Sequence, residues 1–382
     1  MHRIQTSWLT LSIALLAFPI LAADGPTDLQ SALKKLRAVE AEGKGNREAT
    51  AAWQSLAKLE AAQLPDLLAG MDGAGPLAEN WLRSAADAIA ERTLKSGGKL
   101  PVMPLEKFLR DQSHSPRARR VAFEWLVKSD PSAKDRLIPT FVDDSSVELR
   151  REAVAALLAK LEGVKDNSEL IAGYQKALDA ARDLDQIESI AKKLVGLKAE
   201  PKLSEKLGFV QNWKVVAPFD NVKRVGFDTA FPPEKAIDLK ASYPGKEAAK
   251  IEWSDLAAGV NANEPSPGKV GLVDLKKKYD NLKGVVAYAY CEVEAEKAGP
   301  VEFRLGTYNA NKLWVNGQLV MANDVYHGGM EVDQYVARGN LKAGKNTILL
   351  KIAQNEQTEP WTHVWQFQFR ICDAIGTPIP LK

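Results

Sequence analysis

The spacing of apolar residues divides the chain into a half with helical periodicity and a half with strand periodicity. Between residues 28 and 206, apolar residues recur at intervals of three and four in a composition rich in Ala, Leu, Lys and Glu. From Phe209 onward, short alternating runs are separated by Pro, Gly, Asn and Asp. The pattern predicts a multidomain α plus β protein, with a helical domain over residues 24–205 and an antiparallel β-sandwich over residues 206–382.

The helical half contains an internal repeat. The segment SPRARRVAFEWL begins at Ser115, and the similar segment SVELRREAVAAL begins 31 residues later at Ser146, so that Arg119 matches Arg150. Each copy carries one apolar stripe and follows another short helical stretch, which predicts helix pairs of about 30 residues that stack on one another. The arrangement resembles a HEAT-type α-solenoid, and an irregular helical bundle is the alternative.

The second half contains alternating runs that each have one apolar face. Val301, Phe303 and Leu305 alternate with Glu302 and Arg304, for example. So many strands require two sheets. The expected strands lie near residues 213–217, 250–254, 270–274, 285–294, 300–306, 311–315, 318–321, 331–337, 346–353 and 363–372.

The stretch NKLWVNGQLV predicts a β-hairpin. Asn316-Gly317 suits a type I′ turn, because both central residues of that turn have positive φ. Trp314 is then expected to pack in the core rather than bind a ligand. The predicted register pairs Val315 with Gln318, Trp314 with Leu319 and Leu313 with Val320.

The order of strand and turn motifs in residues 208–374 resembles that of the galactose-binding-like jelly rolls of bacterial secreted proteins. The sugar-binding domains of family-two glycoside hydrolases show the same outline. The motifs that recur in that family are a W-V-N-G hairpin, an H-x-G-G stretch and an L-x-x-G-x-N turn. Here they correspond to Trp314 to Gly317, His327 to Gly329 and Leu341 to Asn346. The resemblance implies a jelly roll that binds carbohydrate. It does not imply catalysis, because in those hydrolases the catalytic carboxylates lie in a separate barrel domain.

Such jelly rolls often hold a calcium ion, and three oxygen-bearing side chains lie in one predicted loop. These candidate ligands are Asp220, Asn221 and Asp228. No other cofactor is expected. The four histidines show none of the spacings typical of a zinc site.

Composition and motifs argue against several functions. Fifty-one Lys and Arg residues against 49 Asp and Glu residues give a net charge of +2, which disfavours nucleic-acid binding. The chain shows no nucleophile elbow and no Gly-rich phosphate loop. Glu356 and Glu359 could form a glycosidase acid and base pair, but exposed loop glutamates are common. We therefore expect a protein that is not an enzyme.

The first residues, MHRIQTSWLTLSIALLAFPILAADG, have the features of a secretory signal peptide over residues 1–23. A membrane anchor is the alternative, but the apolar run is shorter than the ~20 residues of a spanning helix. We expect a periplasmic or secreted protein with no membrane span after cleavage. In that compartment Cys291 and Cys372 could form a disulfide, but the alternation of each strand turns their side chains toward different faces. The sequence does not decide whether they pair.

A sugar site on the predicted jelly roll would use aromatic and planar polar side chains from the rim loops. The partner would be a glycan or an extracytoplasmic protein, with the helical repeats as an interaction scaffold. A structural or assembly protein without sugar binding, and an enzyme related to glycoside hydrolases, are the alternatives. The candidate ligand-binding residues are Tyr308, Asn309, Asp324, Tyr326, His327 and Trp361.

Overall fold

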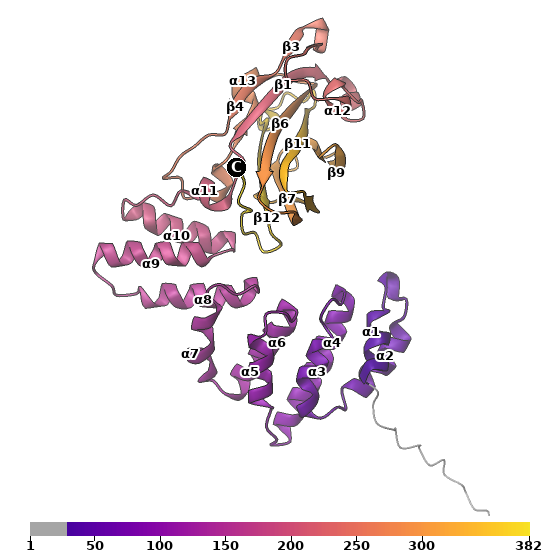
Figure 1. The fold of residues 1–382 in the computed structure, drawn as a ribbon, viewed down its shortest axis with the longest axis vertical. Helices are drawn as coiled ribbons and strands as arrows, with labels where there is room; N and C mark the ends of the chain where they lie inside the picture. Colours follow the sequence, from indigo (N-terminus) through magenta and orange to yellow (C-terminus); the bar gives the residue numbers. More distant parts are fainter. Residues whose placement is uncertain (1–28) are drawn as a thin grey trace, which may run out of the picture. The chain divides into compact units, whose positions relative to one another are not determined.

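The computed structural model describes residues 29–382 and contains two compact units (Figure 1). One unit ends at Ser129 and the other is Asp130–Lys382. The first is helical and the second combines helices with antiparallel sheets, so the chain is a mixed α plus β protein, as predicted. The predicted signal peptide lies outside the described residues. Within residues 29–382, no helix is long and apolar enough to cross a membrane.

The first unit is built from helices that pair in chain order. Contacts join α1 with α2, α3 with α4 and α5 with α6, and further contacts join these pairs to one another. The apolar stripe of each helix is buried against its neighbours. The helices are α1 Leu29–Arg37, α2 Asn46–Leu56, α3 Leu64–Ala69, α4 Pro76–Lys95, α5 Val102–Arg110 and α6 Pro116–Ser129.

The two aligned segments of the sequence form corresponding helices, α6 and, in the second unit, α8. The matching arginines are both buried and perform the same task. Arg119 Nε donates to the main-chain oxygen of Leu109 at 2.7 Å, and Arg150 Nη1 donates to that of Val142 at 3.1 Å. Each arginine therefore satisfies a carbonyl at the C-terminal end of the helical segment that precedes its own helix, where main-chain oxygens lack helical partners. The repeat in the sequence reflects a repeated local structure.

The second unit begins with helices that pack onto its sheets. Their shared apolar core includes Leu178 and Ile190 and extends to Phe209 and Val270, which lie beyond the helices in the chain. The change from helix to strand thus occurs after residue 207, inside a compact unit that begins at Asp130. The helical elements are α7 Ala133–Leu137, η3 Ile138–Phe141, α8 Val147–Lys160, α9 Asn167–Ala180, α10 Leu184–Gly196 and α11 Leu203–Leu207.

The strands form two main antiparallel sheets and a small two-stranded one. The six-stranded sheet has the order β4-β1-β6-β11-β8-β9, the four-stranded sheet β10-β7-β12-β5, and β2 pairs with β3. The strands are β1 Asn212–Asp220, β2 Ser242–Pro244, β3 Lys250–Glu252, β4 Ser254–Ala257, β5 Val273–Asp274, β6 Val285–Ala295, β7 Gly299–Thr307, β8 Ala310–Val315, β9 Gln318–Asn323, β10 Tyr335–Leu341, β11 Gly344–Gln354 and β12 Gln366–Cys372.

The two main sheets share one hydrophobic core. Phe303 and Phe369 from the four-stranded sheet and Ala289 and Leu350 from the six-stranded sheet belong to it. Cys291 also lies in this core, whereas the Cys372 thiol lies on the opposite face of β12, 3.9 Å from the main-chain oxygen of Glu302. Both cysteines are free and buried, as their positions on different faces require.

Several details of the predicted strands are wrong. The stretch expected at residues 250–254 is divided between β3 and β4, the strand expected at 270–274 is only Val273–Asp274, and β2 was not expected. In the hairpin, Val315 pairs with Gln318 and Trp314 with Leu319, as predicted, but Leu313 pairs with Met321 because a bulge inserts an extra residue in β9. Such bulges are common at sheet edges, and β9 is an edge strand. The strand expected at residues 331–337 begins at Tyr335, because Asp333 has a φ of +59° that an extended strand does not accommodate.

The position of Trp314 also differs from the prediction. Trp314 is half-buried, and it packs on the outer face of the six-stranded sheet, in a cluster with Tyr288 and Phe231. It therefore does not belong to the core between the two sheets.

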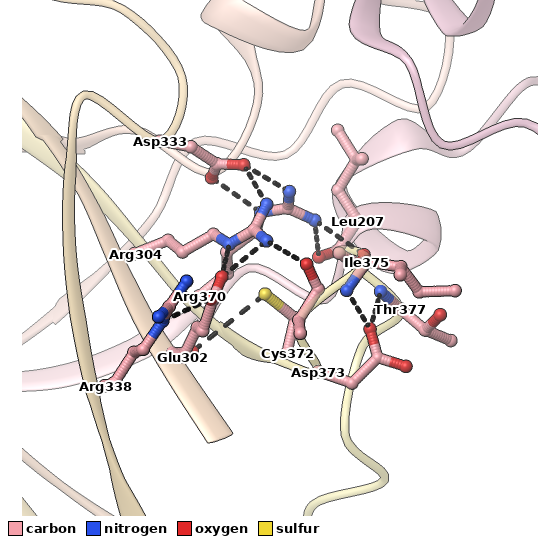
Figure 2. Close-up of polar contacts among 12 residues, drawn as sticks. Leu207, Glu302, Arg304, Asp333, Arg338, Arg370, Cys372, Asp373, Ile375 and Thr377 are labelled. Atoms are coloured by element: carbon pink, nitrogen blue, oxygen red, sulfur yellow. Dashed lines mark hydrogen bonds and ion pairs between the residues drawn. The ribbon is translucent and has the colours of Figure 1, made fainter. Parts of the chain in front are cut away.

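Charged residues cover the outer face of the four-stranded sheet. Asp333 accepts hydrogen bonds from Arg304 and Arg370, and Arg304 also donates to Glu302 (Figure 2). Arg370 Nη1 donates to the main-chain oxygen of Leu207, the last residue of α11, at 3.2 Å. This cluster joins the sheet to the helices that precede it.

Candidate functional site

Four loops meet at one end of the paired sheets, and we call this end the rim. The strand register places the end of β1 beside the start of β6, and the end of β11 beside the start of β8. The end of β9 also lies beside the start of β8, and the end of β7 lies beside the start of β12. The loops that follow β1, β7, β9 and β11 therefore lie at the same end.

The structure brings several predicted ligand-binding residues together at the rim. The His327 ring lies 5.5 Å from the Trp361 ring, nearly perpendicular to it, and 6.4 Å from the Tyr326 ring. Trp361, in η7 Pro360–Thr362, is 59% exposed. The result is a group of three rings in which the largest faces solvent.

The other three candidates have different roles. Asn309 is fully buried, so its side chain supports the rim from beneath. Tyr308 contributes its main-chain oxygen, which accepts from His327 N at 2.6 Å. Asp324 is exposed and follows β9. Of these three residues, only Asp324 is exposed to solvent.

A network of buried amides holds the rim loops together. Asn309 Nδ2 donates to Gln354 Oε1 at 2.7 Å, and Gln354 Nε2 donates to the main-chain oxygen of Thr362 at 2.9 Å. Asn221 Nδ2 donates to the main-chain oxygen of Gln354 at 3.0 Å and to Tyr326 Oη at 3.1 Å. The loops that carry Tyr326 and Trp361 are thus fixed to one buried residue, Gln354, which limits the entropy lost when a ligand binds.

The backbone at His327 is in a conformation that non-glycine residues rarely adopt. Its φ is +58°. The hydrogen bond to Tyr308 holds the main chain, and Asn355 Oδ1 lies 2.8 Å from the ring atom Nε2. Backbone strain of this kind persists only where surrounding contacts compensate for it, and it is concentrated at functional sites.

Three buried polar atoms in this network have no hydrogen-bond partner within the protein. They are Asn221 Oδ1, Asn309 Oδ1 and His327 Nδ1. Native proteins pair most buried polar groups, so such atoms are informative where they gather. These three atoms lie close together in the support of the rim loops, and they are buried rather than presented to a ligand.

Arg224 is a rim residue that the sequence did not indicate. Its guanidinium lies 5.0 Å from the centre of the Tyr326 ring, a cation–π contact. Burial raises the pKa of the Tyr326 hydroxyl, so this group is a neutral hydrogen-bonding group at physiological pH. Gln354 and Asn355 were also missed, although an amide in the inward position of the run ILLKIAQ was a usable signal.

Each of the three predicted calcium ligands makes a hydrogen bond or an ion pair with a different part of the protein. Asp220 Oδ1 accepts from the main chain of Val222 at 3.4 Å, Asn221 uses its amide nitrogen within the network, and exposed Asp228 pairs with Lys312 at 3.2 Å. Within residues 29–382, no group of three or more His, Cys, Asp or Glu side chains is placed to hold a metal ion.

Glu356 and Glu359, considered as a catalytic pair, are both exposed and serve local structure. Glu356 Oε1 accepts from the main-chain nitrogen of Lys223 at 2.7 Å, which ties the loop after β11 to the 3-10 segment η4 Val222–Phe227. The main-chain oxygen of Glu359 accepts from Thr362 at the start of η7. These contacts assign both residues to loop structure.

No protein-family model and no curated protein matches the chain. Solved structures that are similar to part of it include a β-glucosidase from Kluyveromyces marxianus in complex with glucose, with 14% identity, a TM-score of 0.20, and coverage of 30% of this chain and 15% of that chain. A GH31 α-xylosidase from Xanthomonas citri has 16% identity, a TM-score of 0.17, and coverage of 25% and 13%. Selenomethionine-labelled β-glucosidase from K. marxianus has 10% identity, a TM-score of 0.26, and coverage of 76% and 36%.

The chain thus spans 13% to 36% of the length of these structures. At TM-scores this low, the likeness says nothing about the activity of this chain.

Proposed function

We propose that the chain is an exported, non-catalytic binding protein whose rim engages carbohydrate. In this proposal the paired sheets are a galactose-binding-like jelly roll, and the helices are HEAT-like repeats that serve as an interaction scaffold. The observation that carries the proposal is the exposed Trp361 ring held against His327 beside Tyr326. Aromatic rings pack against the apolar C–H faces of sugars, and fixed polar groups then orient the hydroxyls.

The buried amides beneath the rings support this assignment. A sugar site loses less entropy on binding when the loops that carry it are already rigid. Asn221 and Asn309 are fully buried and are held by Gln354. The rim therefore combines one exposed platform with a rigid polar base.

Binding of the full chain to a panel of neutral and acidic polysaccharides tests the proposal. Affinity electrophoresis and isothermal titration calorimetry should detect at least one ligand. Trp361→Ala should weaken binding roughly 30-fold, as for a residue worth about 2 kcal/mol. Val260→Ala is the matched control, since Val260 is 72% exposed and follows the end of β4, which pairs with the start of β1 at the end of the sheet opposite the rim. The affinity of this variant should stay unchanged. No binding across the panel, or equal binding by Trp361→Ala, would reject the proposal.

A second function, docking of an extracytoplasmic protein, is favoured by exposed valines around the same rim. Val222, Val225 and Val325 are all exposed. Exposed apolar patches often mark surfaces that contact other proteins. Val225→Asp should abolish capture of a protein partner while leaving polysaccharide binding intact, which separates the two functions.

A further inference from the structure

The outer face of the six-stranded sheet holds a second concave site, separate from the rim. Its volume is about 190 Å³, and Glu234, Tyr290, Trp314, Thr347 and Leu349 are among its lining residues. These residues come from four elements: the short helix α12 Pro232–Lys235 and strands β6, β8 and β11. No rim residue is among those lining this pocket.

The floor of the pocket follows the strand register. Tyr290 pairs with Leu349, and Leu349 pairs with Trp314, so the three residues form one row across β6, β11 and β8. Neighbouring strands are about 4.8 Å apart, which places the backbones of Tyr290 and Trp314 about 10 Å apart. The two aromatic residues therefore flank Leu349 on one face of the sheet.

A carboxylate on the wall of the pocket is held in a fixed direction. Glu234 Oε1 accepts from Lys351 Nζ at 2.8 Å and from the Tyr288 hydroxyl. Lys351 is fully buried and also donates to the main-chain oxygens of Phe227 at 2.9 Å and Thr229 at 2.8 Å. Both side-chain contacts use the same oxygen of Glu234, and the buried cation keeps that side chain in place.

The electrostatics of this cluster restrict the class of ligand. Burial lowers the pKa of Lys351, and the hydrogen bond to Glu234 opposes that shift, as expected for a charged pair. Since Lys351 balances the charge of Glu234 and Lys235 also lines the pocket, a cationic ligand has no net attraction. A wholly apolar ligand would remove water from the carboxylate without replacing its hydrogen bonds.

We propose that this pocket binds one pyranose ring of a carbohydrate, between Tyr290 and Trp314. The apolar face of the sugar packs on the aromatic side chains, and its hydroxyls donate to Glu234 and bond with the hydroxyl of Thr347. The volume admits a single ring rather than a long chain segment. This site goes beyond the proposed function of the rim, and it needs neither Trp361 nor Tyr326.

The test uses the full chain and the methyl glycosides of glucose, galactose, mannose, xylose and N-acetylglucosamine, with N-acetyltryptophanamide as an apolar probe. Saturation-transfer NMR and calorimetry should detect at least one glycoside. Trp314→Ala and Thr347→Val should each weaken it, the first at least 10-fold. Leu319→Ala is the control, because Leu319 pairs with Trp314 in the hairpin but does not line the pocket, and its affinity should match that of the unchanged chain.

The outcomes separate this site from the rim. Binding lost in Trp314→Ala or Thr347→Val but kept in Trp361→Ala supports the pocket, even if the rim binds nothing. Binding lost only in Trp361→Ala overturns the pocket and leaves the rim proposal standing. No glycoside binding, or binding of N-acetyltryptophanamide alone, also overturns it. If Trp314→Ala does not fold, Thr347→Val, which preserves side-chain shape, decides the question.

Discussion

Arg370 pairs with Asp333, and the same guanidinium also donates to the main-chain oxygen of Leu207 (Figure 2). Because Leu207 ends α11, Arg370 joins the sheet to the helices. Arg370 is 2% exposed, and Asp333 is shared with Arg304. A buried cation of this kind depends on its counter-ion, because the energy of leaving it unpaired is large.

Asp333→Asn is expected to destabilise the second unit by about 3 kcal/mol, because removing one partner leaves Arg370 buried without full compensation. Asparagine tolerates the positive φ at this position, so the change removes charge rather than backbone geometry. Urea unfolding gives the free energy. Glu252→Gln, in the exposed pair with Lys250, is the control and should shift it by less than about 0.5 kcal/mol. Equal effects would contradict a structural role for the cluster.

Stability should fall at acidic pH in a way that depends on Asp333. Burial alone would raise its pKa, but hydrogen bonds and charges from Arg370 and Arg304 outweigh burial and hold the pKa below its ordinary value. A folded-state pKa lower than the unfolded value of about 3.9 means that this stabilisation is present above that value and is lost as pH falls through the folded pKa. Thermal unfolding of the unchanged chain, measured from about pH 6 to about pH 2, should show the loss of this stabilisation.

In the Asp333→Asn variant this part of the acid dependence should be missing. The two proteins should therefore differ most above about pH 4 and converge below it. Parallel curves over the whole range would show that Asp333 does not titrate as argued.

Both thiols should be unreactive in the folded protein. Burial raises the pKa of Cys291 well above its ordinary range and raises that of Cys372 to about 11, so neither forms thiolate near neutral pH. A thiol reagent added to the native chain should modify neither cysteine, and in concentrated urea it should modify both. No modification in urea would reveal a disulfide between Cys291 and Cys372 and would contradict their positions on different faces.

The turn of the β8–β9 hairpin depends on Gly317, whose φ is +79°. Gly317→Ala should destabilise the second unit by about 1 kcal/mol, because a Cβ is strained in this region even where space is open. Gly299→Ala is a matched control: a Cβ there also meets nothing within 4 Å, and its backbone is not left-handed. The control should be neutral or slightly stabilising. Denaturant midpoints measured on both variants check the difference.

Local features of the fold could be predicted, and relationships between distant strands could not. The Asn316-Gly317 turn and its two nearest pairs follow from turn chemistry within four residues. The bulge beyond them depends on how edge strand β9 lies against β8, which alternation does not encode. Asn221 illustrates the same limit for the rim: its loop suggested a metal ligand, while its amide serves Gln354 and Tyr326.

The sequence by itself determined the division into helices and antiparallel strands, the inward face of β7, and the opposite orientations of Cys291 and Cys372, because these depend on periodicities of a few residues. Only the tertiary structure decided that Lys351, at a polar position of β11, is fully buried by the segment from Phe227 to Glu234. It also decided that Trp314 faces outward into a pocket. The outer face of a strand is exposed to solvent or buried according to which segment covers it. Here the covering segment lies far away in the chain.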